Sequence, residues 1–261
     1  MHNFEFVKPA SVAEAVKALK ADGAQALSGG QTLMPTMKQR LAAPAVLVSL
    51  TGIAEMKGVR LDGKVLEIGA ATPHAVVAKE AAAHYPALAR LAGGIGDPAV
   101  RNRGTIGGSL ANNDPSACYP AAVLASGATV VTNRREIAAD DYFQGLFSTA
   151  LEEGEIITRV RFPIPERAAY AKFNQPASRF ALTGAFVAKH AGGVRVAITG
   201  ASEGGVFRWS EAEAALGRDF SAGAVSGLKV AADDMISDLH GSAAYRANLV
   251  RVMTGRAVQA A

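Results

Sequence analysis

The chain has 261 residues, 49% of them hydrophobic and 19% charged, as expected of a soluble globular protein with one large or two modest domains. A formal net charge of only +4, without basic runs interleaved with aromatics, argues against a nucleic-acid partner. The first residues lack the basic and apolar regions of a secretory signal, and no stretch reaches the roughly 20 apolar residues that span a bilayer.

Cys118 is the single cysteine of the chain. One thiol cannot form an internal disulfide, and it cannot supply the four thiolates of an iron–sulfur cluster. We therefore expect a reducing cytoplasm as the compartment. If the protein does redox chemistry, any metal carriers must belong to other chains.

The first quarter of the chain carries the signals of a small βαβ-like unit. Ser11 and Glu14 form a capping box that predicts the start of a helix, and Gly23 stands where its C-cap is expected. The elements expected next are a strand over 24–27, a helix over 33–40 and a strand over 46–50.

The next hundred residues combine a hairpin with helices around a glycine-rich stretch. Asp62-Gly63 interrupts an alternating run over 59–70 and predicts a β-hairpin. Thr72-Pro73 predicts the N-cap and first turn of a helix. Further elements are expected as helices over 82–91 and 116–126, a glycine-rich stretch over 93–108, and strands over 129–132 and 156–162.

Pro163 and Pro165 predict a stiff connection, because each proline restricts the residue before it. We place a domain boundary there, between residues 1–163, with two α+β subdomains that meet near 55–60, and residues 164–261. The second part is expected to hold a hairpin of two apolar runs, 181–189 and 194–199, and helices over 210–216, 223–236 and 242–257. The sequence thus predicts an α+β protein.

Two glycine loops carry the chemical signal. Ser28-Gly29-Gly30-Gln31-Thr32 joins a predicted strand to a predicted helix, where paired glycines let backbone amides approach a phosphate or diphosphate. The run from Arg103 to Pro115 again combines paired glycines with hydroxyl and amide side chains, and adds Asp114 as an acceptor for sugar hydroxyls. Two such loops suit a long diphosphate cofactor, with ordinary tight turns as the alternative.

Generic nucleotide motifs do not apply to these loops. The chain has no G-x-x-x-x-G-K-[ST] sequence, and Gly94-Ile95-Gly96 lacks the third glycine of a dinucleotide fingerprint. The sequence therefore predicts neither a P-loop nor a Rossmann domain.

Five segments together resemble one known family, the FAD-binding medium subunits of the carbon monoxide dehydrogenase and xanthine dehydrogenase type. The resemblance rests on Ser28–Lys38, Gly96–Pro115, Glu155–Pro163, Lys172–Ala181 and Tyr245–Val250, so it extends over almost the whole chain. It implies a two-lobed FAD-binding domain of the PCMH (vanillyl-alcohol-oxidase-like) type, followed by a smaller C-terminal domain of sheet and helices.

The resemblance also implies which residues bind FAD. The first loop and the Thr-Ile-Gly-Gly loop would form two walls, Asp114 would anchor cofactor hydroxyls, Ile157 would lie against the adenine, and Lys172 and Phe180 would lie near the isoalloxazine. The full implied set is Ser28, Gly29, Gly30, Gln31, Thr32, Leu33, Thr105, Gly107, Gly108, Ser109, Asn113, Asp114, Ile157, Lys172 and Phe180.

The sequence departs from the family pattern at a few places. Gln31-Thr32 is a variant of the more usual His-Ser or Gln-Ser pair, but it keeps a polar side chain and a hydroxyl. Asn174 stands where many relatives have lysine, which would weaken a contact with the flavin or an anionic partner. The C-terminal domain is also somewhat short.

The function implied by the resemblance is electron transfer within a larger oxidoreductase. A molybdopterin-containing large subunit would oxidise the substrate, [2Fe–2S] clusters of a small subunit would relay the electrons, and FAD on this chain would pass them to a quinone, oxygen or NAD. The family forms dimers of heterotrimers. This chain would need no acid–base pair, metal or nucleophile of its own. The identity of the oxidised substrate does not follow from this sequence.

Three other functions compete with this one. Gly200-Ala201-Ser202-Glu203-Gly204 matches the G-x-S-x-G nucleophile elbow of serine hydrolases, although Gly205 to Arg208 intervene before the next helical signal. A stand-alone flavoprotein would need a catalytic acid or base over the flavin. An assembly subunit without FAD would be expected to lack the glycine loops, and both are present.

Overall fold

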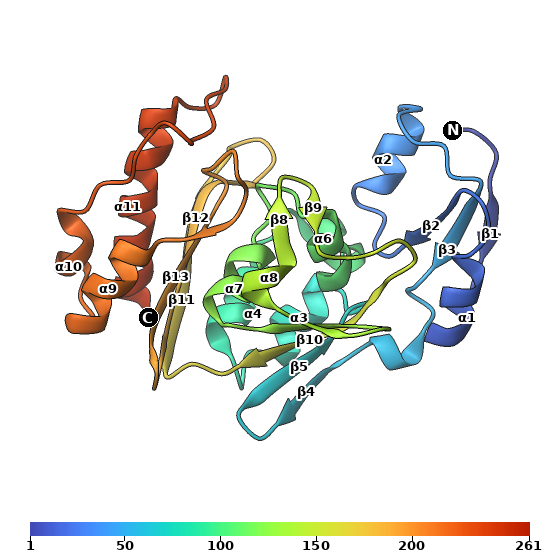
Figure 1. Cartoon of the computed structure of the whole chain (residues 1–261), viewed down its shortest axis with the longest axis horizontal. Helices are drawn as coiled ribbons and strands as arrows, with labels where there is room; N and C mark the ends of the chain where they lie inside the picture. Colours follow the sequence, from blue (N-terminus) through green and yellow to red (C-terminus); the bar gives the residue numbers. More distant parts are fainter.

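The three largest β-sheets follow one another along the long axis of the molecule, each built from a different part of the chain (Figure 1). The structure is a computed structural model that describes residues 1–261. Helices fill the space between the second and third sheets and cover the outer face of the third (Figure 1). This mixture of elements confirms the predicted α+β class.

The first lobe is the predicted βαβ-like unit with one more strand. Its three-stranded parallel sheet has the order β1-β3-β2. The Ser11 Oγ accepts a hydrogen bond from the Glu14 amide at 3.2 Å, so the predicted cap is confirmed. Gly23 is not a C-cap, because the helix ends at Ala18. The elements are β1 (Glu5–Val7), α1 (Val12–Ala18), β2 (Ala24–Leu27), α2 (Leu33–Lys38) and β3 (Val46–Ser49).

The second lobe is a five-stranded antiparallel sheet whose middle strand is the last to be reached along the chain. The order is β4-β5-β10-β6-β7, and the hairpin predicted at Asp62-Gly63 joins the first two strands. The strands are β4 (Val59–Asp62), β5 (Val65–Gly69), β6 (Thr129–Thr132), β7 (Glu136–Ala138) and β10 (Ile157–Pro163), and a small hairpin, β8 (Phe143–Gly145) and β9 (Ser148–Thr149), lies outside this sheet.

The helices of this lobe differ from the prediction in two respects. The glycine-rich stretch over 93–108 contains helical turns that the sequence analysis did not anticipate. Thr72 does not cap a helix, because its hydroxyl is engaged with both backbone groups of Gly58 and the N-cap is Pro73. The helices are η1 (Ala54–Met56), α3 (His74–Glu80), α4 (Pro86–Gly93), α5 (Pro98–Arg103), α6 (Ile106–Asn112), α7 (Tyr119–Ala125) and α8 (Ala139–Tyr142).

The third unit is a four-stranded antiparallel sheet with the order β11-β12-β13-β14. The hairpin predicted for the two apolar runs is confirmed, but the helix expected over 223–236 ends at Ser226 because Gly227 and an irregular segment follow. The elements are β11 (Arg167–Asn174), β12 (Ala181–His190), β13 (Gly193–Thr199), β14 (Phe207–Arg208), α9 (Ser210–Arg218), α10 (Ala222–Ser226) and α11 (Ala243–Ala260).

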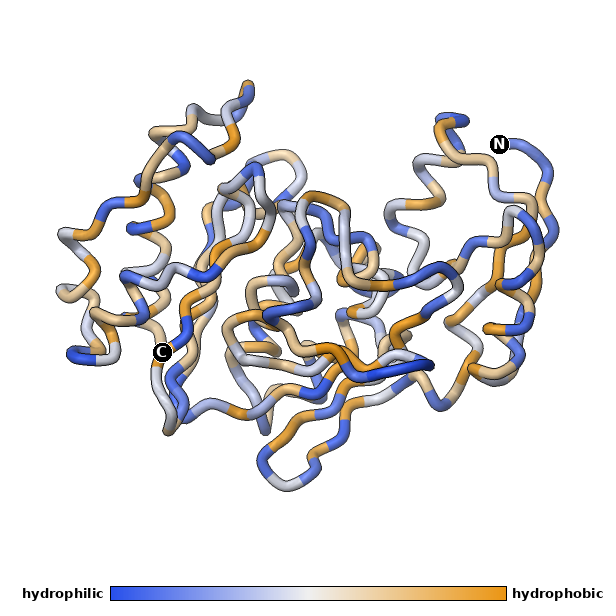
Figure 2. Tube along the Cα trace, in the orientation of Figure 1, coloured by the Kyte–Doolittle hydropathy of each residue, from blue (hydrophilic) through white to orange (hydrophobic).

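Strand β12 is buried on both faces and joins two hydrophobic cores. Phe186 and Ala188 belong to the core of the second lobe, whereas Ala185 and Val187 pack with α11 in the core of the third unit. Figure 2 shows apolar residues along the strands in the middle of the molecule. The boundary proposed at 163/164 therefore marks a change of sheet while the packing continues across it. No helix is long and apolar enough to cross a membrane.

Arg246 on α11 is buried to 3% exposure and holds three segments of the third unit together. Its guanidinium donates hydrogen bonds to the carbonyls of Leu182 and Gly200 at 2.6 and 2.7 Å, and it pairs with Asp238 at 2.7 Å. Leu182 lies at the start of β12, Gly200 follows β13, and Asp238 lies in the segment before α11. A single cation thus ties the residues just before α11 to two strands of the third unit.

We expect Arg246→Met to lower the free energy of unfolding by about 3 kcal/mol, because removal of the cation leaves buried carbonyls and a carboxylate without their partner. Chemical denaturation monitored by circular dichroism measures the change. Arg256→Met, at an exposed position on the same helix, is the control and should change stability by less than about 0.5 kcal/mol. Equal stability of the two variants would contradict this role.

Candidate functional site

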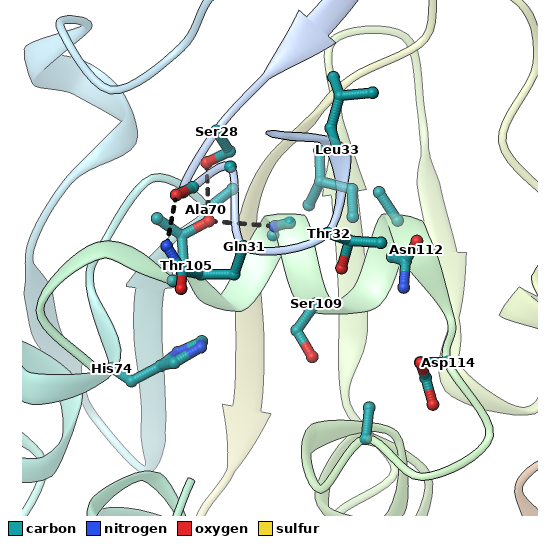
Figure 3. Close-up of a pocket in the computed structure, with 18 of the residues that line it drawn as sticks. Ser28, Gln31, Thr32, Leu33, Ala70, His74, Thr105, Ser109, Asn112 and Asp114 are labelled. Carbon is teal, nitrogen blue, oxygen red and sulfur yellow. Dashed lines mark hydrogen bonds between the residues drawn. The ribbon is translucent and has the colours of Figure 1, made fainter. Parts of the chain in front are cut away.

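A cavity of about 400 Å³ lies where the first and second lobes meet and where β11 ends (Figure 3). This volume falls within the range of roughly 300–1,000 Å³ that is usual for ligand pockets. Among the predicted cofactor-binding residues, Asn113 alone does not line it. The cavity brings together Ser28, Gly29, Gly30, Gln31, Thr32, Leu33, Thr105, Gly107, Gly108, Ser109, Asp114, Ile157, Lys172 and Phe180.

The two glycine loops are joined to each other directly. The hydroxyls of Ser28 and Thr105 form a hydrogen bond of 2.7 Å between the lobes. Gly29 packs on the backbone of Arg103 and Gly104 so closely that a Cβ at position 29 would lie 2.6 Å from the Gly104 Cα. Gly29 is therefore required for the approach of one lobe to the other.

The second loop uses its amides and glycines mainly within the protein. The Gly107 amide donates to the Ala70 carbonyl at 2.9 Å, and the Gly108 amide donates to the Thr105 Oγ1 at 3.1 Å. A Cβ at position 107 would lie 2.6 Å from that of Ala70. The expectation that these amides point at a ligand is thus corrected for the second loop, because the protein already satisfies them.

The first loop, in contrast, leaves its backbone amides free of hydrogen bonds within the protein. The amides of residues 29–32 donate none of the backbone hydrogen bonds in loops and turns, and the Thr32 hydroxyl makes no capping bond to α2. Gly30 has a φ of 69°, a backbone conformation that glycine adopts readily. Successive free amides of this kind form a concave anion site. This donor set fits the diphosphate of FAD.

The acidic residue of the second loop faces the cavity, and its neighbour does not. Asp114 lies at the far side of the cavity in Figure 3, and its Oδ1 accepts a hydrogen bond from the Ser116 amide at 2.8 Å. The Asn113 side chain donates to the carbonyls of Gly145 and Ser148, both at 2.8 Å, so it holds the β8–β9 hairpin. Asn112, which the sequence analysis passed over, lines the cavity instead.

One apolar group in the cavity is fixed by a buried carboxylate. Ile157 and Leu151 line the cavity near Glu155, which accepts hydrogen bonds from Thr132 at 2.7 Å and from Arg135 at 3.1 Å. Burial raises the pKa of Glu155, but the hydrogen bonds from Arg135, the Glu152 amide and Thr132 outweigh it and lower the pKa to about 2. An ionised Glu155 therefore anchors the start of β10.

A second apolar group lies beside Lys172 and includes Ile95, Val100 and Cys118. The Lys172 ammonium donates to the carbonyls of Gly94 and Arg179, both at 2.8 Å, and lies 3.5 Å from the Cys118 Sγ. It therefore joins the second lobe to the turn after β11. That turn leaves the predicted aromatic residue, Phe180, 51% exposed at the cavity.

Sequence reasoning missed residues that reach the cavity from unexpected elements. His74 begins α3 and is 4% exposed, and Glu155 precedes β10. His74 was expected only near a helix start, and Glu155 opens a segment of the family resemblance but was given no role of its own. No local sequence pattern predicts either position. His74 reaches the cavity because Pro73 pairs with Thr105, and Glu155 reaches it because β10 is the central strand of its sheet.

Comparison with known proteins identifies the family of this chain. Residues 2–165 match the family model for the FAD binding domain in molybdopterin dehydrogenase. The carbon monoxide dehydrogenase medium chain of Hydrogenophaga pseudoflava is 35% identical, with 99% of this chain and 96% of the relative covered. The nicotine 6-hydroxylase medium subunit of Paenarthrobacter nicotinovorans is 34% identical, with 97% and 95% covered.

Solved structures show the same likeness in three dimensions. Carbon monoxide dehydrogenase from Hydrogenophaga pseudoflava superposes with a TM-score of 0.90 at 36% identity, over 100% of this chain and 97% of the other. Quinoline 2-oxidoreductase from Pseudomonas putida 86 gives 0.88 at 29% identity, with 100% and 97% covered. These matches confirm the predicted fold class.

The chain therefore belongs to the family of FAD-binding domains of molybdopterin dehydrogenases. Within that family it corresponds, over nearly its full length, to the FAD-binding medium subunits of the molybdenum hydroxylases. FAD is accordingly its cofactor, and the predicted oxidoreductase class is confirmed.

Gly29→Ala tests the close approach of the two loops. The new Cβ collides with backbone, so we expect a loss of about 1–3 kcal/mol in stability and more than a tenfold loss of FAD affinity. Thermal melts and fluorescence titration with FAD measure both. Gly192→Ala, where a Cβ meets nothing within 4 Å, serves as the control and should resemble the wild type. A Gly29→Ala protein with unchanged FAD affinity would contradict the proposed geometry.

Glu155→Gln tests the buried carboxylate. Because the folded-state pKa is depressed, the carboxylate stabilises the fold above pH 4.5, and this contribution disappears as the pH falls towards about 2. The variant should therefore be less stable than the wild type at pH 7, and the difference should shrink below pH 4.5. Urea unfolding across this range measures it. Glu153→Gln, an exposed neighbour, should show no such gap.

Proposed function

We propose that this chain is the electron-transfer subunit of a heteromeric molybdenum hydroxylase, in which FAD receives electrons from iron–sulfur clusters of a partner and delivers them to an external acceptor. The observation that carries the proposal is the free donor set of residues 29–32 inside a cavity whose lining also includes apolar residues such as Ile157 and Ile95. A dinucleotide has the matching chemistry, because a diphosphate joins two planar ring systems.

The chemistry of the residues that line the cavity indicates which part of FAD each of them binds. The first-loop amides and Thr32 bind the diphosphate, and Asp114 and Ser109 bind hydroxyls of the sugar and ribityl chain. Ile157 packs on the adenine, and the region around Lys172 and Phe180 receives the isoalloxazine. FAD supplies the redox chemistry when bound, and the protein binds, orients and shields it.

The partners belong to the same proposal. The relatives are named medium chains or medium subunits, and a single cysteine cannot hold an iron–sulfur cluster. These points support a small subunit with [2Fe–2S] clusters, a large subunit with the molybdopterin cofactor, and assembly as a dimer of heterotrimers in the cytoplasm. The large subunit would choose among substrates such as carbon monoxide, aldehydes, purines or N-heteroaromatics.

The geometry gives little support to a serine hydrolase. The Ser202 Oγ accepts a hydrogen bond from the Gly204 amide at 3.0 Å, and the small pocket beside it contains no histidine. The segment after Ser202 leads into β14, whereas a nucleophile elbow leads directly into a helix. The match to the motif is thus explained as a loop.

A stand-alone flavoprotein would need a free acid or base beside the flavin. Lys172 donates to two carbonyls, and Glu155 is held by Arg135 and Thr132. Both groups are engaged in holding the protein together. Neither Lys172 nor Glu155 is therefore free to act as that acid or base.

Reconstitution tests the proposed function. The purified chain is incubated with FAD, alone and with the iron–sulfur subunit of its own complex, and passed through gel filtration. We expect flavin absorbance to co-elute at about one FAD per chain, and the flavin to bleach under anaerobic conditions when the partner, reduced beforehand with dithionite and freed of excess reductant, is added. A colourless protein under both conditions, or bound flavin that the reduced partner cannot bleach, would refute the electron-transfer role.

The same preparation addresses the hydrolase alternative. Turnover of p-nitrophenyl acetate by the wild type but not by Ser202→Ala would favour that function instead. We expect both proteins to be equally inactive towards this ester.

A further inference from the structure

His74 is a buried histidine in the wall of the cofactor cavity, and the sequence analysis gave it no role. Its backbone amide donates to the Gly104 carbonyl at 2.9 Å, which fixes the start of α3 beside the second glycine loop. A Cβ at position 104 would lie 2.6 Å from the His74 Nε2, so glycine at this position leaves room for the ring. The imidazole points towards the cavity in Figure 3.

The His74 ring lacks the hydrogen bonds that a buried imidazole normally makes. Its Nδ1 has no partner and is shielded from the cavity, whereas Nε2, beside Gly104, makes no hydrogen bond and is the nitrogen left to donate; Figure 3 draws no hydrogen bond to the ring. Tyr119, whose ring centre lies 5.3 Å away, also has a buried hydroxyl without a partner. Unsatisfied buried polar groups cost about 1–3 kcal/mol each, and such groups in native proteins call for an explanation.

His74 adjoins the junction of the two glycine loops through Gly104, and it adjoins the apolar group beside Lys172 through Tyr119. Tyr119, against which it packs, follows Cys118, and Cys118 lies 3.5 Å from the Lys172 ammonium. The charge of Arg101, which donates to the carbonyls of Ile95 and Gly96, also acts on His74. Ile157 and Leu151 belong to the other apolar group.

The imidazole is uncharged at neutral pH. Burial, followed by the positive charge of Arg101, lowers the pKa of His74 to about 4. A neutral imidazole has one N–H to donate and one nitrogen to accept. It is therefore suited to an uncharged polar partner and poorly suited to balancing a phosphate.

We propose that His74 donates a hydrogen bond to a polar atom of the isoalloxazine and thereby sets the affinity and the reduction potential of the bound flavin. This inference rests on the proposed function, in which the cavity holds FAD. The polar ring atoms become richer in electrons when the flavin is reduced, so a fixed donor stabilises the reduced form more than the oxidised form. His74 would thus raise the potential.

His74→Phe in the full-length chain tests the inference, because phenylalanine keeps a planar ring and removes the donor. We expect FAD affinity to fall about tenfold, the cost of one good hydrogen bond, with a shifted flavin absorption band. We also expect a more negative potential. A tenfold greater loss for the reduced than for the oxidised form corresponds to about 30 mV for a two-electron couple.

Two further variants separate this role from general damage to the fold. His74→Gln retains an N–H donor and should recover part of the affinity and of the potential. His84→Phe removes an exposed histidine of the same lobe and should leave both unchanged. Fluorescence titration and spectroelectrochemistry provide the two readouts.

The outcomes distinguish this inference from the proposed function. If the wild-type chain takes up no FAD, alone or with its iron–sulfur partner, the proposed function fails and the role of His74 fails with it. If the wild type binds FAD and His74→Phe matches His84→Phe in affinity and potential, only the role of His74 is overturned. An affinity loss without rescue by glutamine would also overturn it, since that result indicates packing alone.

Discussion

The contact of two backbone segments is the constraint on which this structure depends. Gly29 at the end of β2 lies against Arg103 and Gly104 before α6, and the hydroxyls of Ser28 and Thr105 tie the segments at 2.7 Å. The two lobes have separate sheets. Their relative position, and hence the shape of the cavity between them, is therefore set to a large extent at this one junction.

The rest of the site is assembled around that junction from distant parts of the chain. Strand β10 enters the middle of the second sheet late in the sequence, and Glu155 anchors its start through Arg135 and Thr132. Lys172 then joins the third unit to the second lobe. The cavity is thus closed by ion pairs and hydrogen bonds whose partners are far apart in sequence, which makes it a property of the whole chain.

The sequence predicted those features that local chemistry controls. The cap at Ser11, the hairpin at Asp62-Gly63 and the two glycine loops each follow from neighbouring residues. The role of each glycine could not be predicted from its neighbours in the sequence. The first loop has free amides, whereas Gly107 packs on Ala70, and only the tertiary structure distinguishes the two.

Sequence patterns did not predict the roles of residues that form tertiary hydrogen bonds. Asn113 and Asn112 are adjacent and chemically identical, and the left-handed backbone at Asn113 decides which one turns to the hairpin and which to the cavity. The segment after Ser226 has helical periodicity, but its Asp234 carbonyl accepts from the Glu203 amide and its Ile236 amide donates to the Ala201 carbonyl, which holds it in an irregular path. In both places tertiary hydrogen bonds prevail over local propensity.

Strand β12, with one core on each of its faces, has a consequence for how such proteins can be recombined. The family model ends at residue 165, which suggests a convenient joint for building chimaeras between relatives. Phe186 nevertheless packs edge-on to Tyr85 on the far side of that joint. A grafted C-terminal unit would have to bring the matching surfaces of α4 and α7 with it, so the module that can be exchanged is larger than the one that sequence families delimit.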